Sequence, residues 1–319
     1  MCGFTGSDRN SVIFIPQKSN TQTTFFYSKT FYQHMKTLLK CFVFVFCILQ
    51  AGKAQTQKIP KGKVIFFDDF NDKKLDSNKW NIEITGFHVN NELQAYVDSA
   101  VTFFIQNSKL VLQPVYTPGF VTKDGQHFDF ISARINTRKK FEFEYGLAEA
   151  RIKLTNGAGL WPAWWILGNG QWPATGEIDV MENVGDAAWA SAAVHGPGYS
   201  GETPFVERYH FPKNNDAAQW HIYAVNWTPD TMVFEYDGKP IYRVTKAMAA
   251  KYGEWAFSNQ KFLILNFALG GNYPAGVNGV KEPYFGLPET TVQQIQQKQA
   301  KMVIDWVKVT QFNAPQNSK

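Results

Sequence analysis

The sequence predicts an all-β protein, a β-sandwich or jelly roll of two curved antiparallel sheets. Three observations support this fold class. Short runs of β-branched and aromatic residues recur, and turn formers such as Asp237-Gly238 and Gly270-Gly271 separate them. Long helical periodicity is nearly absent; only the polar stretch Val292 to Lys301 is expected to form a short helix. No repeat, low-complexity tract or linker follows Lys61, so residues 60–312 are predicted to form one domain.

Eight runs are predicted as strands because they combine strand-forming residues with flanking turn residues. Their lengths are typical of single strands. In chain order they are Val64 to Phe67, Leu110 to Val115, Leu147 to Leu154, Ile178 to Met181, His221 to Trp227, Met232 to Tyr236, Phe262 to Ala268 and Met302 to Thr310.

Residues 35–54 have the order of a secretory signal peptide. A short basic start, Met35 to Lys40, precedes the apolar run Cys41 to Leu49, and a cleavage site is predicted near Ala54. The apolar run is too short to span a bilayer, which needs roughly 20 residues. Since its cysteines do not fit a lipoprotein signal, we expect no membrane anchor and a protein secreted to the extracellular space or a periplasm. Residues 1–34 show no clear pattern and are interpreted as a non-native or mis-assigned extension.

Removal of residues 1–54 changes the thiol content and the charge. The three cysteines of the chain all lie there, so no disulfide is predicted in the remainder. The chain has 32 basic and 27 acidic residues; six basic residues and one acidic residue precede Gln55, which leaves 26 of each. A balance of zero gives no reason to expect nucleic acid or an anionic membrane as a partner and favours a neutral ligand. Nothing indicates more than a monomer.

The stretch Glu177-Ile-Asp-Val-Met-Glu182 places three carboxylates within six residues. In a regular strand Glu177 and Asp179 share one face, because alternate side chains point the same way. Strict alternation would bury Glu182 on the other face, and an unpaired buried carboxylate is costly. A β-bulge at Val180-Met181 would return Glu182 to the face of the other two acids.

Carboxylates gathered in this way repel one another, so at least one pKa is expected to rise. A protonated and an ionised carboxyl group together suit glycoside hydrolysis. A retaining glycosidase holds the two about 5–5.5 Å apart, whereas Glu177 and Glu182 would lie roughly 13 Å apart along a flat strand. The strand is therefore expected to bow, with the acids on its concave side. The residues alone leave the two roles unassigned, and a solvated acidic face or a calcium site is the alternative.

Four tryptophans lie within 16 residues of Glu177. Flat aromatic rings can stack on the apolar faces of sugars. Alternation suggests that Trp164 or Trp165 packs in the core. Trp161 and Trp172 are better candidates for exposure, because Gly and Pro flank them in loop-like contexts.

These motifs and their order resemble glycoside hydrolase family 16, and within it the laminarinase branch of endo-β-1,3-glucanases. The resemblance rests on Gly176 to Glu182, on Trp161 to Trp165 before it and on His195 to Gly201 after it. It spans nearly all of residues 60–312 in order. Further matching segments are Phe70-Asn71, Leu75-Asp76, Lys79-Trp80, Asn90 to Tyr96, Ser132 to Thr137, Tyr145-Gly146, Asn226 to Pro229, Leu265-Asn266, Gly270-Gly271 and Asp305 to Val309.

The resemblance implies a concanavalin-like jelly roll with a concave substrate cleft, and a secreted endo-acting hydrolase that cleaves β-1,3-glucan by a retaining double displacement. It implies Glu177 as nucleophile, Glu182 as general acid/base and Asp179 as assisting carboxylate. It also implies substrate-binding residues in the cleft, namely Asn91, Glu92, Arg134, Trp161, Trp172, His195 and Tyr273.

Each of these substrate-binding assignments has a structural alternative. His195 could be a core histidine, although its Gly-Pro-Gly neighbours favour a loop. Arg134 and Glu92 could form a salt bridge, and Asn91 a loop hydrogen bond. Tyr273 stands where laminarinases commonly carry tryptophan, so it would stack with less area.

The resemblance implies no cofactor for catalysis, but it does imply a structural calcium ion. Asp69 and Asp305 resemble its ligands on the convex side of relatives, and hard oxygen ligands suit calcium. The run Asp68-Asp69-Phe70 has aspartate where glutamate is common, which weakens this expectation.

Two other functions use the same scaffold. The same machinery could act on mixed-linkage β-1,3-1,4-glucan or an agar-type galactan, although zero charge and the lack of a basic run disfavour sulfated galactans. A non-catalytic β-glucan-binding protein is the second alternative, but such proteins typically lose one or both glutamates, and both are present here.

The N-terminal interpretation predicts where the natural product begins. Mapping the N-terminus of protein from its natural source should find Gln55 as the first residue, because a signal peptidase cleaves after small residues such as Ala54. A peptide from residues 1–34 in the exported protein would contradict both the start at Met35 and the cleavage.

Overall fold

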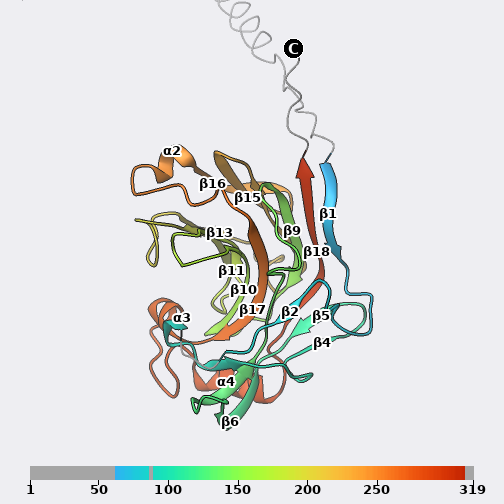
Figure 1. Cartoon of the computed structure of the whole chain (residues 1–319). Helices are drawn as coiled ribbons and strands as arrows, with labels where there is room; N and C mark the ends of the chain where they lie inside the picture. Colours follow the sequence, from blue (N-terminus) through green and yellow to red (C-terminus); the bar gives the residue numbers. More distant parts are fainter. Residues whose placement is uncertain (1–61, 86–88, 313–319) are drawn as a thin grey trace, which may run out of the picture. The chain divides into compact units, whose positions relative to one another are not determined.

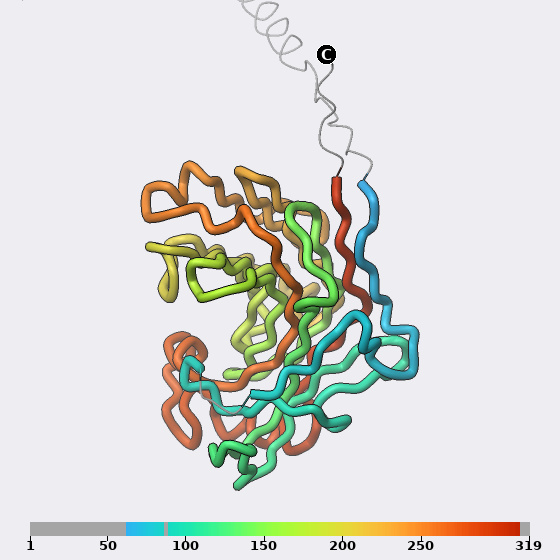
Figure 2. Tube along the Cα trace, viewed as in Figure 1, coloured from blue at the N-terminus to red at the C-terminus, as the bar shows by residue number. Residues whose placement is uncertain are grey.

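The structure is a computed structural model that describes residues 62–85 and 89–312 (Figures 1 and 2). The predicted signal peptide and the N-terminal extension lie outside these residues. The described part forms two large sheets and one small sheet. None of its helices has the length and apolar character that crossing a membrane would require.

The eight-stranded sheet is antiparallel throughout. Its path begins at a hairpin whose turn, Asp237-Gly238, has two positive φ angles, as a tight two-residue turn needs. The order is β16 (Lys239–Thr245), β15 (Thr231–Tyr236), β14 (His221–Trp227), β9 (Gly146–Lys153), β18 (Met302–Phe312), β5 (Leu110–Leu112) and β4 (Phe103–Ile105), with β1 (Gly62–Asp68) also paired to β18.

The seven-stranded sheet is antiparallel as well, and its strand β17 is visibly bowed in Figure 2. The order is β13 (Val206–His210), β12 (Trp189–His195), β11 (Glu177–Glu182), β10 (Leu160–Gly168), β17 (Lys261–Leu269), β8 (Arg134–Asn136) and β2 (Asn81–Ile82). A three-stranded sheet joins β3 (Gln94–Tyr96), β7 (His127–Ser132) and β6 (Val115–Val121), and its β3–β7 pair is parallel.

Helices are short and lie at the ends of strands. They are η1 (Val89–Asn91), α2 (Lys246–Ala249), α3 (Asn272–Asn278) and α4 (Glu289–Gln296). The helix expected at 292–301 is α4, which begins earlier, directly after Pro288, and ends before Lys298, a residue with φ of +58°.

The core lies between the two large sheets. Along β9 every second residue is buried, for example Ala150 and Ile152, and β18 contributes Ile304. Trp164 and Ile178 of the seven-stranded sheet belong to the same cluster. Both large sheets thus bury one face against the other, as in a β-sandwich, and burial of this apolar surface stabilises the fold. The predicted fold class is confirmed.

Most predicted strands are present, but one was misplaced and several were missed. The run Leu110 to Val115 is two strands, because β5 ends before Gln113-Pro114 and β6 begins after it, and proline cannot donate to a sheet ladder. Strand β10 was not predicted as a strand because it contains Pro162 and is rich in tryptophan, and β12 was missed because it is rich in alanine.

Candidate active site

Strand β11 contains the predicted β-bulge. On β10, Trp165 pairs with Asp179 and Trp164 pairs with Met181, so Val180 is the extra residue. On the other side, three steps along β11 match two steps along β12 between Asp179 and Glu182. Val180 and Met181 are both fully buried. The bulge thus places two consecutive side chains in the core and returns Glu182 to the face of the other acids.

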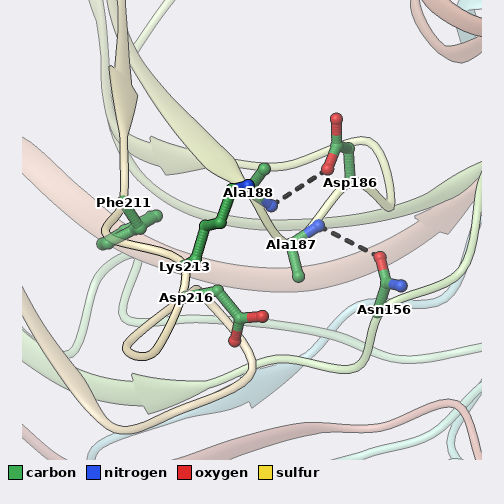
Figure 3. A pocket seen from close by; sticks show the side chains of 7 residues that line it. All are labelled: Asn156, Asp186, Ala187, Ala188, Phe211, Lys213 and Asp216. Carbon is green, nitrogen blue, oxygen red and sulfur yellow. Dashed lines mark hydrogen bonds between the residues drawn. The ribbon is translucent and has the colours of Figure 1, made fainter.

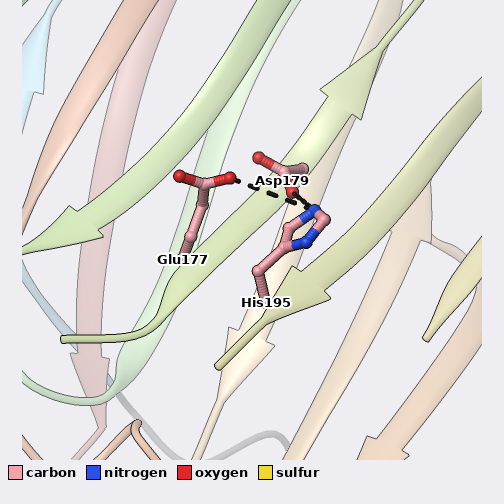
Figure 4. A group of neighbouring side chains, drawn as sticks. All are labelled: Glu177, Asp179 and His195. Atoms are coloured by element: carbon pink, nitrogen blue, oxygen red, sulfur yellow. Dashed lines mark ion pairs between the residues drawn. The ribbon is translucent and has the colours of Figure 1, made fainter. Parts of the chain in front are cut away.

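His195 approaches the acids from the neighbouring strand β12, where it pairs with Glu177. Its Nε2 lies 3.2 Å from Oδ2 of Asp179 and 4.0 Å from Oε1 of Glu177, and Figure 4 shows the ring directed at both carboxylates. His195 is the last residue of β12, so the expected loop position was wrong, while its place beside the acids is as predicted. These three residues could also hold a divalent cation, since their ligand atoms lie within 4.8 Å of one another.

Burial raises the pKa of all three carboxyl groups, each to about 8. Lost hydration is the largest cause for each pKa, and the charge of Asp179 raises the pKa of both glutamates further. The nearby charges differ between the two. Arg134 lowers the pKa of Glu177, whereas Glu92 raises the pKa of Glu182. Glu182 also accepts the hydrogen bond of Trp161, which lowers its pKa. The cluster therefore holds protons near neutral pH, with the pKa of both glutamates raised to about 8.

Trp161 lies beside Glu182 and binds it. Its indole N–H donates to Oε1 of Glu182 at 2.9 Å. The ring of Tyr273 meets that of Trp161 edge to face at 5.5 Å, and the Tyr273 hydroxyl lies 3.4 Å from Oγ of Ser191. Trp161 belongs to β10, so its expected loop context was wrong. It contacts the acid directly as well as presenting an aromatic surface.

Trp172 lies in the loop of residues 169–176, which joins β10 to β11. It is 44% exposed, and its ring centre lies 6.3 Å from that of His195. The prediction that Trp172 is accessible is confirmed. Trp164, by contrast, is fully buried in the core.

A polar network adjoins Glu177 on the side of β8. Arg134 pairs with Glu83 at 3.0 Å, and its guanidinium lies 4.8 Å from the ring centre of Trp165. The Trp165 indole donates to Oδ1 of Asn266 at 2.7 Å. Trp165 and Asn266 were missed, although the two-residue period along β10 from Trp161 places Trp165 on this face.

Asn91 and Glu92 lie at the margin of the same face. Asn91 donates to Oδ1 of Asn272 at 2.8 Å and so joins η1 to α3, which is the hydrogen bond considered as its alternative role. Glu92 accepts from Gln94 at 2.7 Å. Because its charge acts on Glu182, Glu92 belongs to the electrostatic surroundings of the acids.

The residues expected to bind calcium lie elsewhere and have other partners. One carboxylate oxygen of Asp305 accepts from Lys109 at 2.7 Å, and the other accepts from Arg151. Asp69 accepts from Asn71. Two cations at Asp305 would repel a calcium ion, so this donor set does not fit the implied metal.

A cavity of about 380 Å³ shares no lining residue with the acidic face. Its polar side chains support the surrounding loop, since Asn156 accepts from the Ala187 amide and Asp186 from the Ala188 amide (Figure 3). The residues around it are Asn156, Asp186, Ala187, Ala188, Phe211, Lys213 and Asp216.

A family model matches the chain and covers all three acids. The model described as "Glycosyl hydrolases family 16" matches residues 78–308. Glucan endo-1,3-beta-glucosidase A1 of Niallia circulans is 34% identical in an alignment of 239 positions that covers 67% of this chain. The match spans about a third (34%) of that longer relative.

Solved structures of similar proteins have the same architecture. The laminarinase catalytic domain from Thermotoga maritima MSB8 is 33% identical, with a TM-score of 0.68 over 79% of this chain and 99% of that one. The endo-beta-1,3-glucanase from Pyrococcus furiosus is 32% identical, with a TM-score of 0.70; the match covers 79% of this chain and 95% of that one.

The acidic cluster predicts how stability depends on pH. An unfolded Asp or Glu titrates near pH 4, and the folded pKa values are raised to about 8. The folded state therefore binds more protons between these values, and stability falls as the pH rises through this window. Asp179→Asn removes one charge and relieves both glutamates, so its melting temperature should exceed that of wild type at pH 8 to 9.

The difference in melting temperature between Asp179→Asn and wild type should narrow towards pH 5, where Glu177, Asp179 and Glu182 are all protonated. Calorimetry at several pH values tests this, with the exposed Asp98→Asn as a matched control that leaves the profile unchanged. Parallel profiles for wild type and Asp179→Asn would contradict the raised pKa values.

Proposed function

The chain belongs to glycosyl hydrolase family 16, and we propose that it is a secreted enzyme that hydrolyses internal linkages of laminarin-type β-1,3-glucan. The observation that carries this proposal is the convergence of Glu177, Asp179 and Glu182 on one face of the seven-stranded sheet. Two glutamates of unequal surroundings beside aromatic and polar side chains suit a sugar linkage. The names of the similar proteins support β-1,3-glucan and endo action.

The mechanism that we propose is a retaining double displacement. Glu177 attacks the anomeric carbon, while protonated Glu182 gives its proton to the departing glycosidic oxygen. Glu182 then removes a proton from water, and this water hydrolyses the glycosyl ester on Glu177. This division is the one that the resemblance of the stretch Gly176 to Glu182 to the family implies. Arg134 stabilises a charge on Glu177, whereas Glu182 has an opposing charge in Glu92 and a hydrogen bond from Trp161.

Asp179 and His195 assist by changing the pKa values of the two glutamates. Asp179 is 4% exposed, and its charge raises the pKa of both glutamates. When Asp179 holds a proton, Glu177 can ionise more readily, because one repulsion is removed. His195 contacts Asp179 and Glu177 and lowers the pKa of Glu177 and Glu182, so it limits the energy needed to charge the cluster.

The substrate would bind along aromatic and polar groups on both sides of the acids. Trp172 offers an exposed ring beside His195, and Trp161 with Tyr273 offers a second aromatic pair beside Glu182. Arg134 supplies N–H donors for sugar hydroxyls. A polymer of glucose cannot cross a membrane unaided, which agrees with the signal peptide expected at residues 35–54.

A glucan panel tests the substrate. Incubation with laminarin should release reducing ends and a series of oligosaccharides from the start, because endo cleavage cuts inside the chain. Lichenan and agarose should be cleaved at least tenfold more slowly at equal concentration. Faster cleavage of lichenan or agarose would show that this polymer, and not laminarin, is the substrate. Binding of laminarin without cleavage would indicate a glucan-binding protein.

Azide rescue tests the two glutamate roles. Glu177→Ala and Glu182→Ala should each lower kcat on laminarin by roughly 10²-fold or more. With an activated aryl β-glucoside substrate, azide should yield an α-glycosyl azide with Glu177→Ala, since it attacks in place of the nucleophile. With Glu182→Ala it should yield a β-glycosyl azide, since it attacks the glycosyl-enzyme.

NMR of the azide products distinguishes these outcomes. Glu149→Gln, which changes a glutamate of the eight-stranded sheet paired with Lys308, is the control and should keep wild-type rates. Exchanged anomers between the two alanine variants would reverse the assignment, and full activity in either would refute it.

A further inference from the structure

Lys261, the first residue of β17, is fully buried. Its ammonium, which has three N–H donors, lies within hydrogen-bond distance of four oxygen atoms. These are the carbonyl of Thr175, the carbonyl of Gly176 at 3.3 Å, the carbonyl of Ala256 at 3.1 Å and Oδ1 of Asn259 at 2.8 Å. The charge is thus surrounded by neutral oxygen atoms.

Packing alone gives no reason for a lysine at this place. No carboxylate lies within ion-pair distance of its ammonium among residues 62–85 and 89–312. Burial lowers the pKa of Lys261 to about 7, which reflects the free energy needed to hold a charge there. The rings of Phe257 and Trp227, with centres 5.3 and 5.8 Å away, offset part of this penalty. An apolar side chain of similar length would avoid it.

The four oxygen atoms belong to two segments that meet beside the acids. Thr175 and Gly176 end the loop 169–176 that carries Trp172, and Gly176 directly precedes Glu177. Ala256 and Asn259 belong to the segment before β17. The two segments touch closely, since Gly176 has φ of +72° and a Cβ there would lie 2.3 Å from the Ala256 carbonyl oxygen. Lys261 binds both segments at this contact.

We propose that Lys261 is a positioning residue whose ammonium fixes the loop 169–176 and the start of β11, and thereby the placement of Trp172 and Glu177 against the sugar. The inference rests on the proposed function for its kinetic consequences. Its structural part stands on the hydrogen bonds alone.

The other end of this loop has its own anchor, which makes the role of Lys261 specific. Asn169 donates to Glu142 at 2.8 Å and accepts from Arg138 at 3.0 Å. Within the loop, the Thr175 hydroxyl donates to the Asn169 carbonyl at 2.8 Å. Without Lys261 the loop would stay attached at Asn169 but would lose the bonds of its ammonium to the carbonyls next to Glu177.

The chain offers a matched control in Lys140. Its ammonium also donates to two backbone carbonyls, of Ser77 at 2.6 Å and Trp80 at 2.7 Å, but these lie outside the acidic face. Lys261→Met and Lys140→Met therefore make the same chemical change, the loss of an ammonium that holds backbone carbonyls, at two different places.

The experiment compares kinetics and amide exchange in the full-length protein at 25 °C, with folding checked by circular dichroism. On a β-1,3-linked glucose hexamer, Lys261→Met should raise KM at least fivefold and lower kcat at least tenfold. Amide exchange of residues 171–177 should quicken at least tenfold. Lys140→Met should leave KM, kcat and the exchange rate of residues 171–177 within twofold of the wild-type values. If Lys261→Met does not fold, Lys261→Gln should change KM, kcat and amide exchange in the same directions but by smaller factors.

Each outcome separates the two proposals. Unchanged exchange in 171–177 together with unchanged KM and kcat, even with a lowered melting temperature, would overturn the positioning role. An inactive wild-type protein would overturn the proposed function, and the exchange measurement would still decide whether Lys261 fixes the loop.

Discussion

The single extra residue in β11 is the constraint on which the rest of this site depends. A strand with strict alternation can present Glu177 and Asp179 on one face but would turn Glu182 into the core. The bulge at Val180 removes this conflict, because two consecutive apolar side chains enter the core and Glu182 emerges with the other acids. One local irregularity thus satisfies both the packing of the sandwich and the geometry of the chemistry.

Burying several ionisable groups away from water is unfavourable for folding, and burial of apolar side chains in the sandwich core offsets this penalty. Lost hydration raises the pKa of all three acids and lowers that of Lys261. The same effect serves catalysis, because a carboxyl group that keeps its proton near neutral pH can act as an acid. The two glutamates have different neighbours: Arg134 favours charge on Glu177, whereas Glu182 lies near Glu92 and accepts a hydrogen bond from Trp161.

Local rules predicted the fold class and the bulge, and the resemblance to the family indicated several residues beside the acids, such as His195 and Trp161. The two-residue period along β11 would direct Glu182 into the core, and only an inserted residue returns it to the face of Glu177 and Asp179. Contacts between distant segments could not be predicted in this way. The pairing of Asp305 with Lys109 and Arg151, and the four oxygen atoms around Lys261, depend on how strands far apart in sequence align. Trp165 was missed for a simpler reason, since β10 was not recognised as a strand.

The most direct test of the central claim is to trap the covalent intermediate. A 2-deoxy-2-fluoro β-1,3-glucobiosyl fluoride should label the wild-type protein. Fluorine at C2 slows both formation and hydrolysis of the glycosyl ester, whereas the good fluoride leaving group speeds formation alone, so the ester accumulates. Peptide mass spectrometry should then find one glycosyl group on Glu177. A label on Asp179 or Glu182, or no label in a protein that cleaves laminarin, would contradict the account.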